Sequence, residues 1–244
     1  MEGPSLVISV EELSRFFRKK VTESTTPASL KGLTGRTFKG ARSWGKHLIL
    51  EFTGCILRIH FLMFGSYRIN QPRENRIPKL ELGFKADRVY FYSCAIKEIT
   101  AELVESYDFR TDLMSDAWEE KRVLTLLKPK QEKLVCDVLM DQEIFSGLGN
   151  IMKNEILFRR RLHPETVLGA LRGPEQKRLV RDCRKYSFQF YEWKKANVLK
   201  RNWLIMRKKA CPACGGKVVK KPTGVLKRLS HFCPKCQKKR LNQE

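Results

Sequence analysis

The sequence lacks any apolar run that approaches the roughly 20 residues a membrane-spanning helix needs. Its first residues, Met-Glu-Gly-Pro-Ser, lack the basic start and the apolar stretch of a secretory signal. It has no internal repeat and no low-complexity segment, and 42% of its 244 residues are hydrophobic, which argues against intrinsic disorder. We therefore expect a folded protein that is not secreted and has no membrane partner, with room for one large domain or two modest ones.

Acidic residues are few. The chain has 26 Asp and Glu against 49 Lys and Arg, which gives a formal net charge of +23. This surplus must lie mostly on the surface, where it attracts polyanions, and nucleic acids are the usual polyanions inside a cell. The basic clusters are spread along the chain and form no single amphipathic anchor, so a membrane surface is the weaker alternative. The composition predicts a nucleic-acid partner without telling RNA from DNA.

The eight cysteines fall into two groups. Four are isolated in apolar or mixed segments and are expected to be buried thiols: Cys55, Cys94, Cys136 and Cys183. The other four form two Cys-x-x-Cys pairs, 18 residues apart: Cys211 with Cys214, and Cys233 with Cys236. Two such turns joined by a hairpin supply the four thiolates of a tetrahedral Zn²⁺ site, whereas two disulfides are disfavoured in a chain without an export signal. We expect one structural zinc ion that takes no part in catalysis.

The hydrophobic periodicity changes along the chain. Residues 5–20 have helical spacing, with Ser9 as a plausible N-cap, and residues 20–110 then alternate as short strands. The clearest strands are 46–52, 55–60, 67–69 and 88–92. From residue 117 the spacing becomes helical over 118–128, 131–140, 150–161 and 175–197. The pattern predicts an α+β chain, with a sandwich or barrel-like β domain over 1–112 and a helical domain with the cysteine hairpin over 117–244.

Four motifs occur in order along the chain. They are Glu2-Gly3-Pro4, residues 44–48 (WGKHL), residues 145–158 with His163-Pro164, and Arg228 placed five residues before Cys233. Together they resemble the Fpg/Nei family of bifunctional DNA glycosylases, which includes formamidopyrimidine-DNA glycosylase and endonuclease VIII. The resemblance covers essentially the whole chain. It implies an N-terminal β-sandwich with a leading helix, then a helix–two-turn–helix domain with a C-terminal zinc-finger β-hairpin.

The start of the chain departs from the family pattern. Family members mostly begin Met-Pro-Glu-Gly-Pro and use the exposed proline as nucleophile, whereas here Glu2 follows Met1 directly. The resemblance therefore implies that the α-amine of Met1 takes the role of the proline. An α-amine has a pKa of about 7.7–8.0, against about 10.4 for lysine, and can form a Schiff base with a sugar. Glu2 would move protons, and Lys46 would hold a phosphate or protonate the sugar.

The same resemblance implies the residues that hold DNA. Asn150 follows a glycine-rich turn at the expected start of a helix, which is a ready phosphate site, and Arg228 would hold a second phosphate. An enzyme that flips a base out of a duplex must fill the gap. Leu62, Met63 and Phe64 resemble the adjacent three-residue wedge of endonuclease VIII, while Met63 alone also fits the Fpg pattern. Residues 92–97 take the place of the second loop, which in the Fpg type carries an Arg-Arg-Phe wedge.

These expectations define a leading function and two alternatives. The leading one is a glycosylase and abasic-site lyase of base excision repair, which removes oxidised bases, pyrimidines in preference, through a Schiff base. We expect damaged DNA as partner, a monomer, and a location in the cytoplasm and nucleoid or in the nucleus. The first alternative is a lesion- or DNA-structure-binding protein that lost turnover together with the proline. The second is an RNA-associated zinc protein, which would need neither Glu2 nor Lys46.

Overall fold

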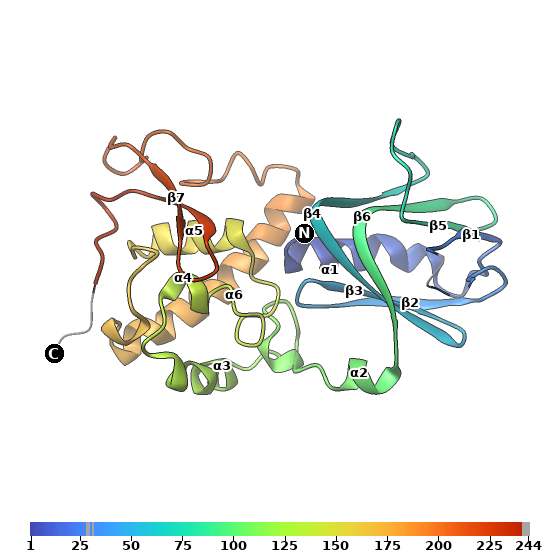
Figure 1. The fold of residues 1–244 in the computed structure, drawn as a ribbon, viewed down its shortest axis with the longest axis horizontal. Helices are drawn as coiled ribbons and strands as arrows, with labels where there is room; N and C mark the ends of the chain where they lie inside the picture. Colours follow the sequence, from blue (N-terminus) through green and yellow to red (C-terminus); the bar gives the residue numbers. More distant parts are fainter. Residues whose placement is uncertain (28–29, 31, 241–244) are drawn as a thin grey trace. The chain divides into compact units, whose positions relative to one another are not determined.

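The computed structural model describes residues 1–27, 30 and 32–240. The chain folds into two compact units, Met1–Tyr107 and Asp108–Glu244 (Figure 1). The α+β class is confirmed, with an antiparallel β-sandwich first and a helical region with a β-hairpin and a cysteine cluster second. The domain ranges 1–112 and 117–244 remain a prediction from the sequence.

The N-terminal unit consists of a leading helix, six strands and a closing helix. These are α1 (Gly3–Leu13), β1 (Glu23–Thr25), β2 (Phe38–Trp44), β3 (His47–Phe52), β4 (Cys55–Ile69), β5 (Leu80–Gly83), β6 (Arg88–Ile99) and α2 (Ala101–Glu105). A short 3₁₀ turn, Ser14–Phe16, follows α1. Thr53 and Gly54 form the tight turn between β3 and β4, where Gly54 adopts a φ of 68°.

The six strands form one antiparallel sheet in the order β1-β5-β6-β4-β3-β2. Strands β4 and β6 are long enough to serve both halves of the sandwich. Residues 56–61 of β4 pair with the last part of β6 beside β3, whereas residues 66–69 pair with the first part of β6 beside β5. The register shifts between Phe61 and Ser66. This bulge separates the two halves.

Helix α1 contributes to the core of the sandwich. It packs against β2 and β3, and Leu6, Leu13 and Phe16 are buried with the inward side chains of the strands. The prediction that Ser9 caps the helix is wrong. The helix begins at Gly3 because Pro4 suits a first turn, and the Ser9 hydroxyl instead donates to the Ser5 carbonyl at 2.9 Å from inside the helix.

The expectation of a second loop at residues 92–97 is also wrong. These residues lie within β6 and pair with β4, Ser66 opposite Tyr92 and Phe61 opposite Cys94. Tyr92 and Cys94 are buried, so the alternation of this segment follows a half-buried strand. The segment therefore supplies no wedge, which leaves residues 62–64 as the predicted wedge.

The C-terminal unit is mainly helical. Its elements are η2 (Phe109–Thr111), α3 (Glu120–Leu127), η3 (Lys128–Lys130), α4 (Val135–Val138), α5 (Asn150–Arg159), η4 (Leu168–Ala170), α6 (Gly173–Lys195), β7 (Val219–Thr223) and β8 (Arg228–Phe232). Helix α5 packs against both α6 and β8. The buried aliphatic side chains of α3 to α6 form one core, and β7 pairs with β8 as an antiparallel hairpin. No helix among the described residues is long and apolar enough to cross a bilayer.

Candidate active site and nucleic-acid interface

The three predicted catalytic residues, Met1, Glu2 and Lys46, belong to the N-terminal unit. Met1 and Glu2 lead directly into α1, where Gly3 and Pro4 are buried and fix the start of the chain. Lys46 was expected in a strand but lies in the two-residue turn between β2 and β3. Gly45 makes this turn with a φ of 56°, a region that glycine occupies without steric cost. Lys46 is therefore presented at the end of the hairpin.

Electrostatics link these three residues. Burial lowers the pKa of the Met1 amine from its ordinary value of 8.0, the positive charge of Lys46 lowers it too, and the carboxylate of Glu2 opposes the fall. Both side chains thus lie near enough to the amine to act on its charge. A lowered pKa leaves more of the amine unprotonated at neutral pH, which is the form that attacks an electrophile.

Two histidines extend the group. His60 of β4 stands opposite His47 of β3, and their ring centroids are 5.3 Å apart. Burial lowers the pKa of His60, and the Met1 amine and Lys46 lower it further. Burial and the nearby charge of Arg58 lower the pKa of His47 to about 4. Both imidazoles are therefore neutral at pH 7, and His60 lies within the electrostatic reach of the amine.

Arg58 and His60 were not identified from the sequence. Strand β4 alternates buried residues with half-buried ones, which places both side chains on the same face. That alternation was readable in the sequence, but the approach of this face to the chain start is a long-range contact. Arg58 donates to the Tyr107 hydroxyl at 3.0 Å, and the Tyr107 ring stacks on Trp44 with 4.4 Å between centroids.

The three predicted wedge residues project from the bulge in β4. Leu62, Met63 and Phe64 are 50%, 74% and 79% exposed, whereas the flanking strand is largely buried or half-buried. The backbone of Phe64 has a φ of 67°, which residues other than glycine rarely adopt. Gly65 has no room for a side chain, since a Cβ would lie 2.6 Å from the carbonyl oxygen of Ser93. The strand is thus built to turn three apolar side chains outward.

Asn150 lies where the glycine turn meets α5. Gly147 has a φ of 91°, Gly149 occupies the N-cap position without a side chain, and Asn150 is the first residue of the helix. The first N–H groups of a helix have no partner within it and favour an anion. The Asn150 amide donates to the Leu229 carbonyl at 3.0 Å, which ties the turn to the β-hairpin.

Arg228 begins strand β8, next to Leu229, and is exposed. Two further contacts hold this strand against α5. The Lys153 ammonium, fully buried, donates to the Ser230 hydroxyl at 2.9 Å, and the His231 amide donates to Asn154 Oδ1 at 3.0 Å. The structure therefore brings Asn150 and the strand of Arg228 together as one interface.

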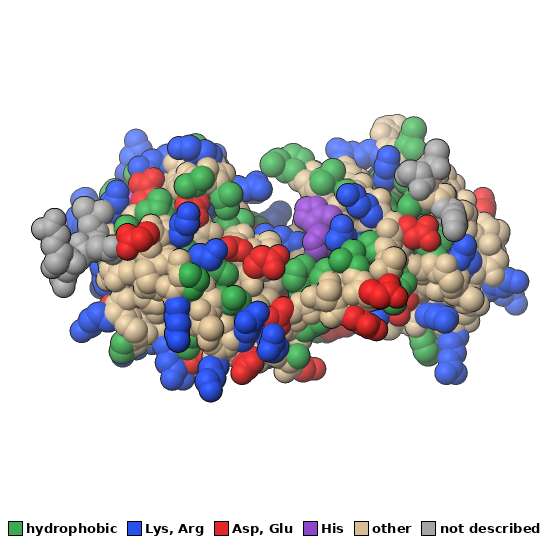
Figure 2. Space-filling view, turned by 60° about the horizontal axis from the view of Figure 1, so that its bottom comes forward, with side chains coloured by type: hydrophobic (Ala, Val, Ile, Leu, Met, Phe, Trp, Pro, Cys, Tyr) green, Lys and Arg blue, Asp and Glu red, His purple; other side chains and the backbone are tan. Residues whose placement is uncertain are grey.

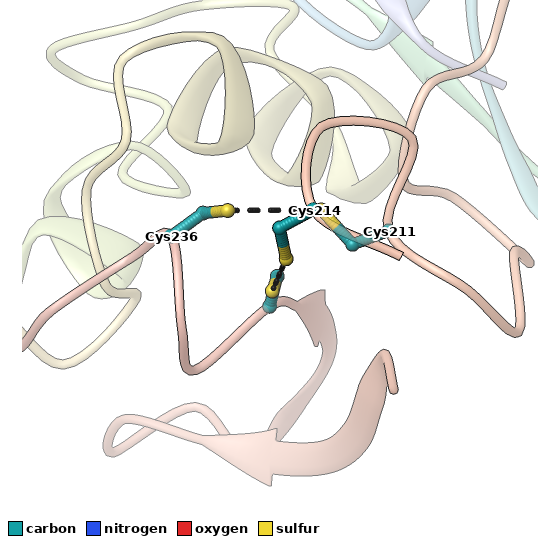
Figure 3. Close-up of side chains that lie close together, drawn as sticks. Cys211, Cys214 and Cys236 are labelled. Carbon is teal, nitrogen blue, oxygen red and sulfur yellow. Dashed lines mark hydrogen bonds between the residues drawn. The ribbon is translucent and has the colours of Figure 1, made fainter. Parts of the chain in front are cut away.

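The four predicted zinc ligands converge (Figure 3). The sulfur atoms of Cys211, Cys214, Cys233 and Cys236 all lie within 4.8 Å of one another, with 3.8 Å from Cys211 to Cys236 and 3.5 Å from Cys214 to Cys233. A tetrahedron of Zn–S bonds of about 2.3 Å separates its sulfurs by about 3.8 Å. A hydrogen bond from the Gly216 amide lowers the pKa of Cys214. Burial raises the pKa of Cys233, and the hydrogen bond with Cys214 raises that of Cys236. The donor set fits a metal ion such as zinc.

The surface charge accords with an anionic partner. Lys and Arg side chains are spread over both units on the face drawn in Figure 2, and Asp and Glu side chains are fewer. Each ion pair, such as Glu120 with Arg181 at 2.8 Å, cancels one positive and one negative charge, so the net charge of +23 is unchanged.

Comparison with known families matches both units. The N-terminal domain of formamidopyrimidine-DNA glycosylase matches residues 7–95, and its H2TH domain matches residues 111–186. Endonuclease 8-like 3 of Xenopus laevis is 35% identical over 230 residues, which cover 88% of this chain and 37% of that protein. Endonuclease 8-like 2 of Bos taurus is 32% identical over 196 residues, 74% of this chain and 58% of that protein. The chain thus spans a little over a third of the length of the first of these relatives.

A solved structure shares the fold. Formamidopyrimidine-DNA glycosylase of Lactococcus lactis, non-covalently bound to DNA that contains an abasic site, superposes with a TM-score of 0.84 at 24% identity and covers 98% of this chain and 100% of that one. Matches to both domain families, in the same order as the two units, agree with this likeness. The chain belongs to the Fpg/Nei family of DNA glycosylases.

Proposed function

We propose that this protein is a DNA glycosylase of base excision repair with abasic-site lyase activity, which acts through the α-amine of Met1. The observation that carries this proposal is the grouping of a half-buried amine of lowered pKa, at the start of α1, with the charges of Glu2 and Lys46. A protein that only binds nucleic acid needs no such group. The relatives named Endonuclease 8-like support the same class of activity.

The chemistry requires an unprotonated amine. Its lone pair attacks C1′ of the deoxyribose, and the damaged base leaves with the electrons of the glycosidic bond and takes up a proton. The amine then loses a proton as the sugar ring opens, and the C1′–N bond becomes a Schiff base. Glu2 is the group that carries these protons, and Lys46 holds a phosphate or protonates the sugar oxygen.

Strand cleavage follows by elimination, in which C2′ loses a proton and the 3′ phosphate leaves. Met1 has a primary amine, so its imine can lose the proton that makes it an electron sink. A secondary amine such as proline would give a permanently charged iminium. We therefore expect base removal to be faster than strand cleavage in this protein.

DNA binding is divided between the two units. Asn150, at the start of α5, and Arg228 would hold phosphates near the lesion. Leu62, Met63 and Phe64 would fill the gap left by the flipped base, and their resemblance to the wedge of endonuclease VIII supports oxidised pyrimidines as substrates. One Zn²⁺ on the four cysteines would stabilise the hairpin that presents Arg228. We propose action as a monomer on nuclear or nucleoid DNA.

Excision from defined oligonucleotides tests this function. Duplexes that carry thymine glycol, dihydrouracil, 8-oxoguanine or an abasic site are incubated with the protein and with its Glu2→Gln variant. We expect release of the two oxidised pyrimidines, with at least a 100-fold loss of rate in the variant. Tight binding of these duplexes with no base release or cleavage would instead favour the lesion-binding alternative.

A further inference from the structure

The tip of the β7–β8 hairpin has a defined backbone. Residues 224–227 connect the two strands, and Gly224 and Lys227 have φ angles of 68° and 49°. The backbone amides of Val225 and Leu226 donate hydrogen bonds to the two carboxylate oxygens of Asp137, at 3.0 Å and 3.2 Å.

Asp137 belongs to helix α4, far away in the sequence. Hydrogen bonds from consecutive backbone amides to an ionised carboxylate are among the stronger kinds in proteins. Gly224 completes the fit, because a Cβ at this position would lie 2.3 Å from one of the Asp137 oxygens. The hydrogen bonds from Val225 and Leu226 and the close approach of Gly224 thus fix the tip in one conformation around the Asp137 carboxylate.

The tip so held is apolar and is followed directly by two cations. Val225 is 80% exposed and Leu226 is 51% exposed, and Lys227 and Arg228 follow them directly. The positive neighbours make an acidic partner the fitting one. Apolar side chains between cations suit a DNA groove, where the sugars present apolar edges between the phosphates.

By its charge alone, a carboxylate at a surface that binds DNA is unfavourable. Asp137 adds a negative charge near a surface that meets phosphates, which weakens binding. Its presence at the tip is explained when its hydrogen bonds to the amides of Val225 and Leu226 outweigh this repulsion.

We propose that Asp137 is a positioning residue, which holds residues 224–227 so that Val225 and Leu226 meet the DNA groove as a rigid apolar edge beside Arg228. This inference rests on the proposed DNA-binding function. It adds to that function a residue of the helical region that acts on DNA only through the hairpin.

The decisive comparison uses two variants with the same charge change. Asp137→Asn and Asp182→Asn each remove one negative charge, and Asp182, which lies on α6, pairs with Arg160 at 3.4 Å. Charge alone predicts that both variants bind an abasic-site duplex at least as tightly as the wild type. Positioning predicts that Asp137→Asn binds about 10-fold more weakly, whereas Asp182→Asn does not. Equal or tighter binding by Asp137→Asn would overturn the proposal.

A local measurement separates positioning from misfolding. Amide hydrogen exchange of Val225 and Leu226 is expected to be slow in the DNA-free protein and fast in Asp137→Asn, with bound zinc and melting temperature unchanged. Loss of zinc in the variant, or fast exchange already in the wild type, would contradict a specific clamp.

Two further variants test the contacts at the tip. A Val225→Ser/Leu226→Ser protein is expected to lose about 10-fold in affinity with an unchanged salt dependence, because no cation is removed. The double variant Gly224→Ala/Asp137→Asn should lose less binding free energy for DNA than the sum of the losses in the two single variants, because both changes disturb the same turn. Full additivity would contradict the coupling.

The two proposals fail in different ways. If the wild type neither binds nor processes damaged duplexes, the proposed function fails. If the wild type does both and Asp137→Asn behaves like Asp182→Asn, only the positioning role fails. Tight binding of the tip variants to DNA would leave the apolar edge to a protein partner instead.

Discussion

The Met1 amine is tuned by neighbours that act in opposite directions. Burial and Lys46 lower its pKa, and Glu2 raises it. Replacement of Glu2 by Gln removes the raising charge, so the pKa falls further. Replacement of Lys46 by Gln removes a lowering charge, so the pKa rises towards 8.0.

These opposite shifts can be measured without any turnover. The rate of acylation of the α-amine by acetic anhydride follows its unprotonated fraction across pH. We expect a midpoint below 8.0 for the wild type, a lower one for Glu2→Gln and a higher one for Lys46→Gln. Shifts of the same sign in both variants would show that the two side chains do not flank the amine. Glu102→Gln, on α2, serves as the charge control.

His47 links pH to stability. Burial lowers its pKa from 6.5 to about 4 in the folded protein. The unfolded chain therefore binds a proton between these values that the folded protein does not, so stability falls as the pH drops through this range. His60, His163 and His231 also have lowered pKa values and act in the same direction. We expect the melting temperature to fall from pH 6.5 to pH 4, less steeply in His47→Gln; equal slopes would contradict this assignment.

At the residue scale, local patterns were predictable, whereas contacts between residues far apart in the sequence were not. The cysteine ligands follow from spacing alone, since each Cys-x-x-Cys turn is a local structure. His60 and Asp137 gain their roles from residues far away in the sequence, the chain start for one and the hairpin tip for the other. Their roles depend on the register of β4 and on the packing of α4.

The bulge in β4 is the element that presents Leu62, Met63 and Phe64. We expect their joint replacement by Ala to slow base excision from duplex DNA about 10- to 100-fold and to leave excision from single-stranded DNA nearly unchanged, because only a duplex leaves a gap to fill. Ile77→Ala is the matched control, since Ile77 is 94% exposed elsewhere in the same unit. An equal loss on both substrates would argue against a wedge.

The cysteine cluster stabilises an element with little core of its own. Only a few buried apolar side chains surround it, among them Phe158, Ile205 and Val218. Removal of zinc by a chelator, or the change Cys214→Ser, should therefore unfold the hairpin and reduce DNA binding at least 10-fold. Cys94→Ala should keep both the metal and DNA binding. Metal content by atomic absorption, with affinity by fluorescence anisotropy, measures the outcome; unchanged affinity of the metal-free protein would contradict it.

At the element scale, the sequence predicted type better than extent. The strands at 55–60 and 67–69 are one strand, β4, because the bulge interrupts the alternation without ending the pairing. Residues 92–97 were misjudged for a related reason: Ser93 and Lys97 break the apolar run, although β6 continues to pair through them. The glycine turn before α5 was predictable, since Gly147 and Gly149 mark it directly.

The whole molecule carries a net charge of +23, so its DNA affinity should fall steeply with salt. Each lysine or arginine that contacts a phosphate contributes a slope of about −0.9 to the logarithm of affinity against the logarithm of salt concentration. We expect Arg228→Ala to reduce the slope by about 1 and Asn150→Ala to weaken binding with no change of slope, since its amide is neutral. A full slope in Arg228→Ala would place this guanidinium away from phosphate.

The organisation of the whole chain was predictable because composition, spacing and motif order agreed. A basic surplus, a cysteine hairpin and four ordered motifs lead to the same family that the comparisons show. The nucleophile could not be derived in this way, because Met1 stands where other family members present proline.

Trapping of the covalent intermediate tests that assignment most directly. The protein is mixed with an abasic-site duplex, reduced with borohydride and digested, and the cross-linked peptide is identified by mass. We expect a sugar adduct on the α-amine of Met1. An adduct on the side chain of Lys46, or no adduct at all, would contradict it.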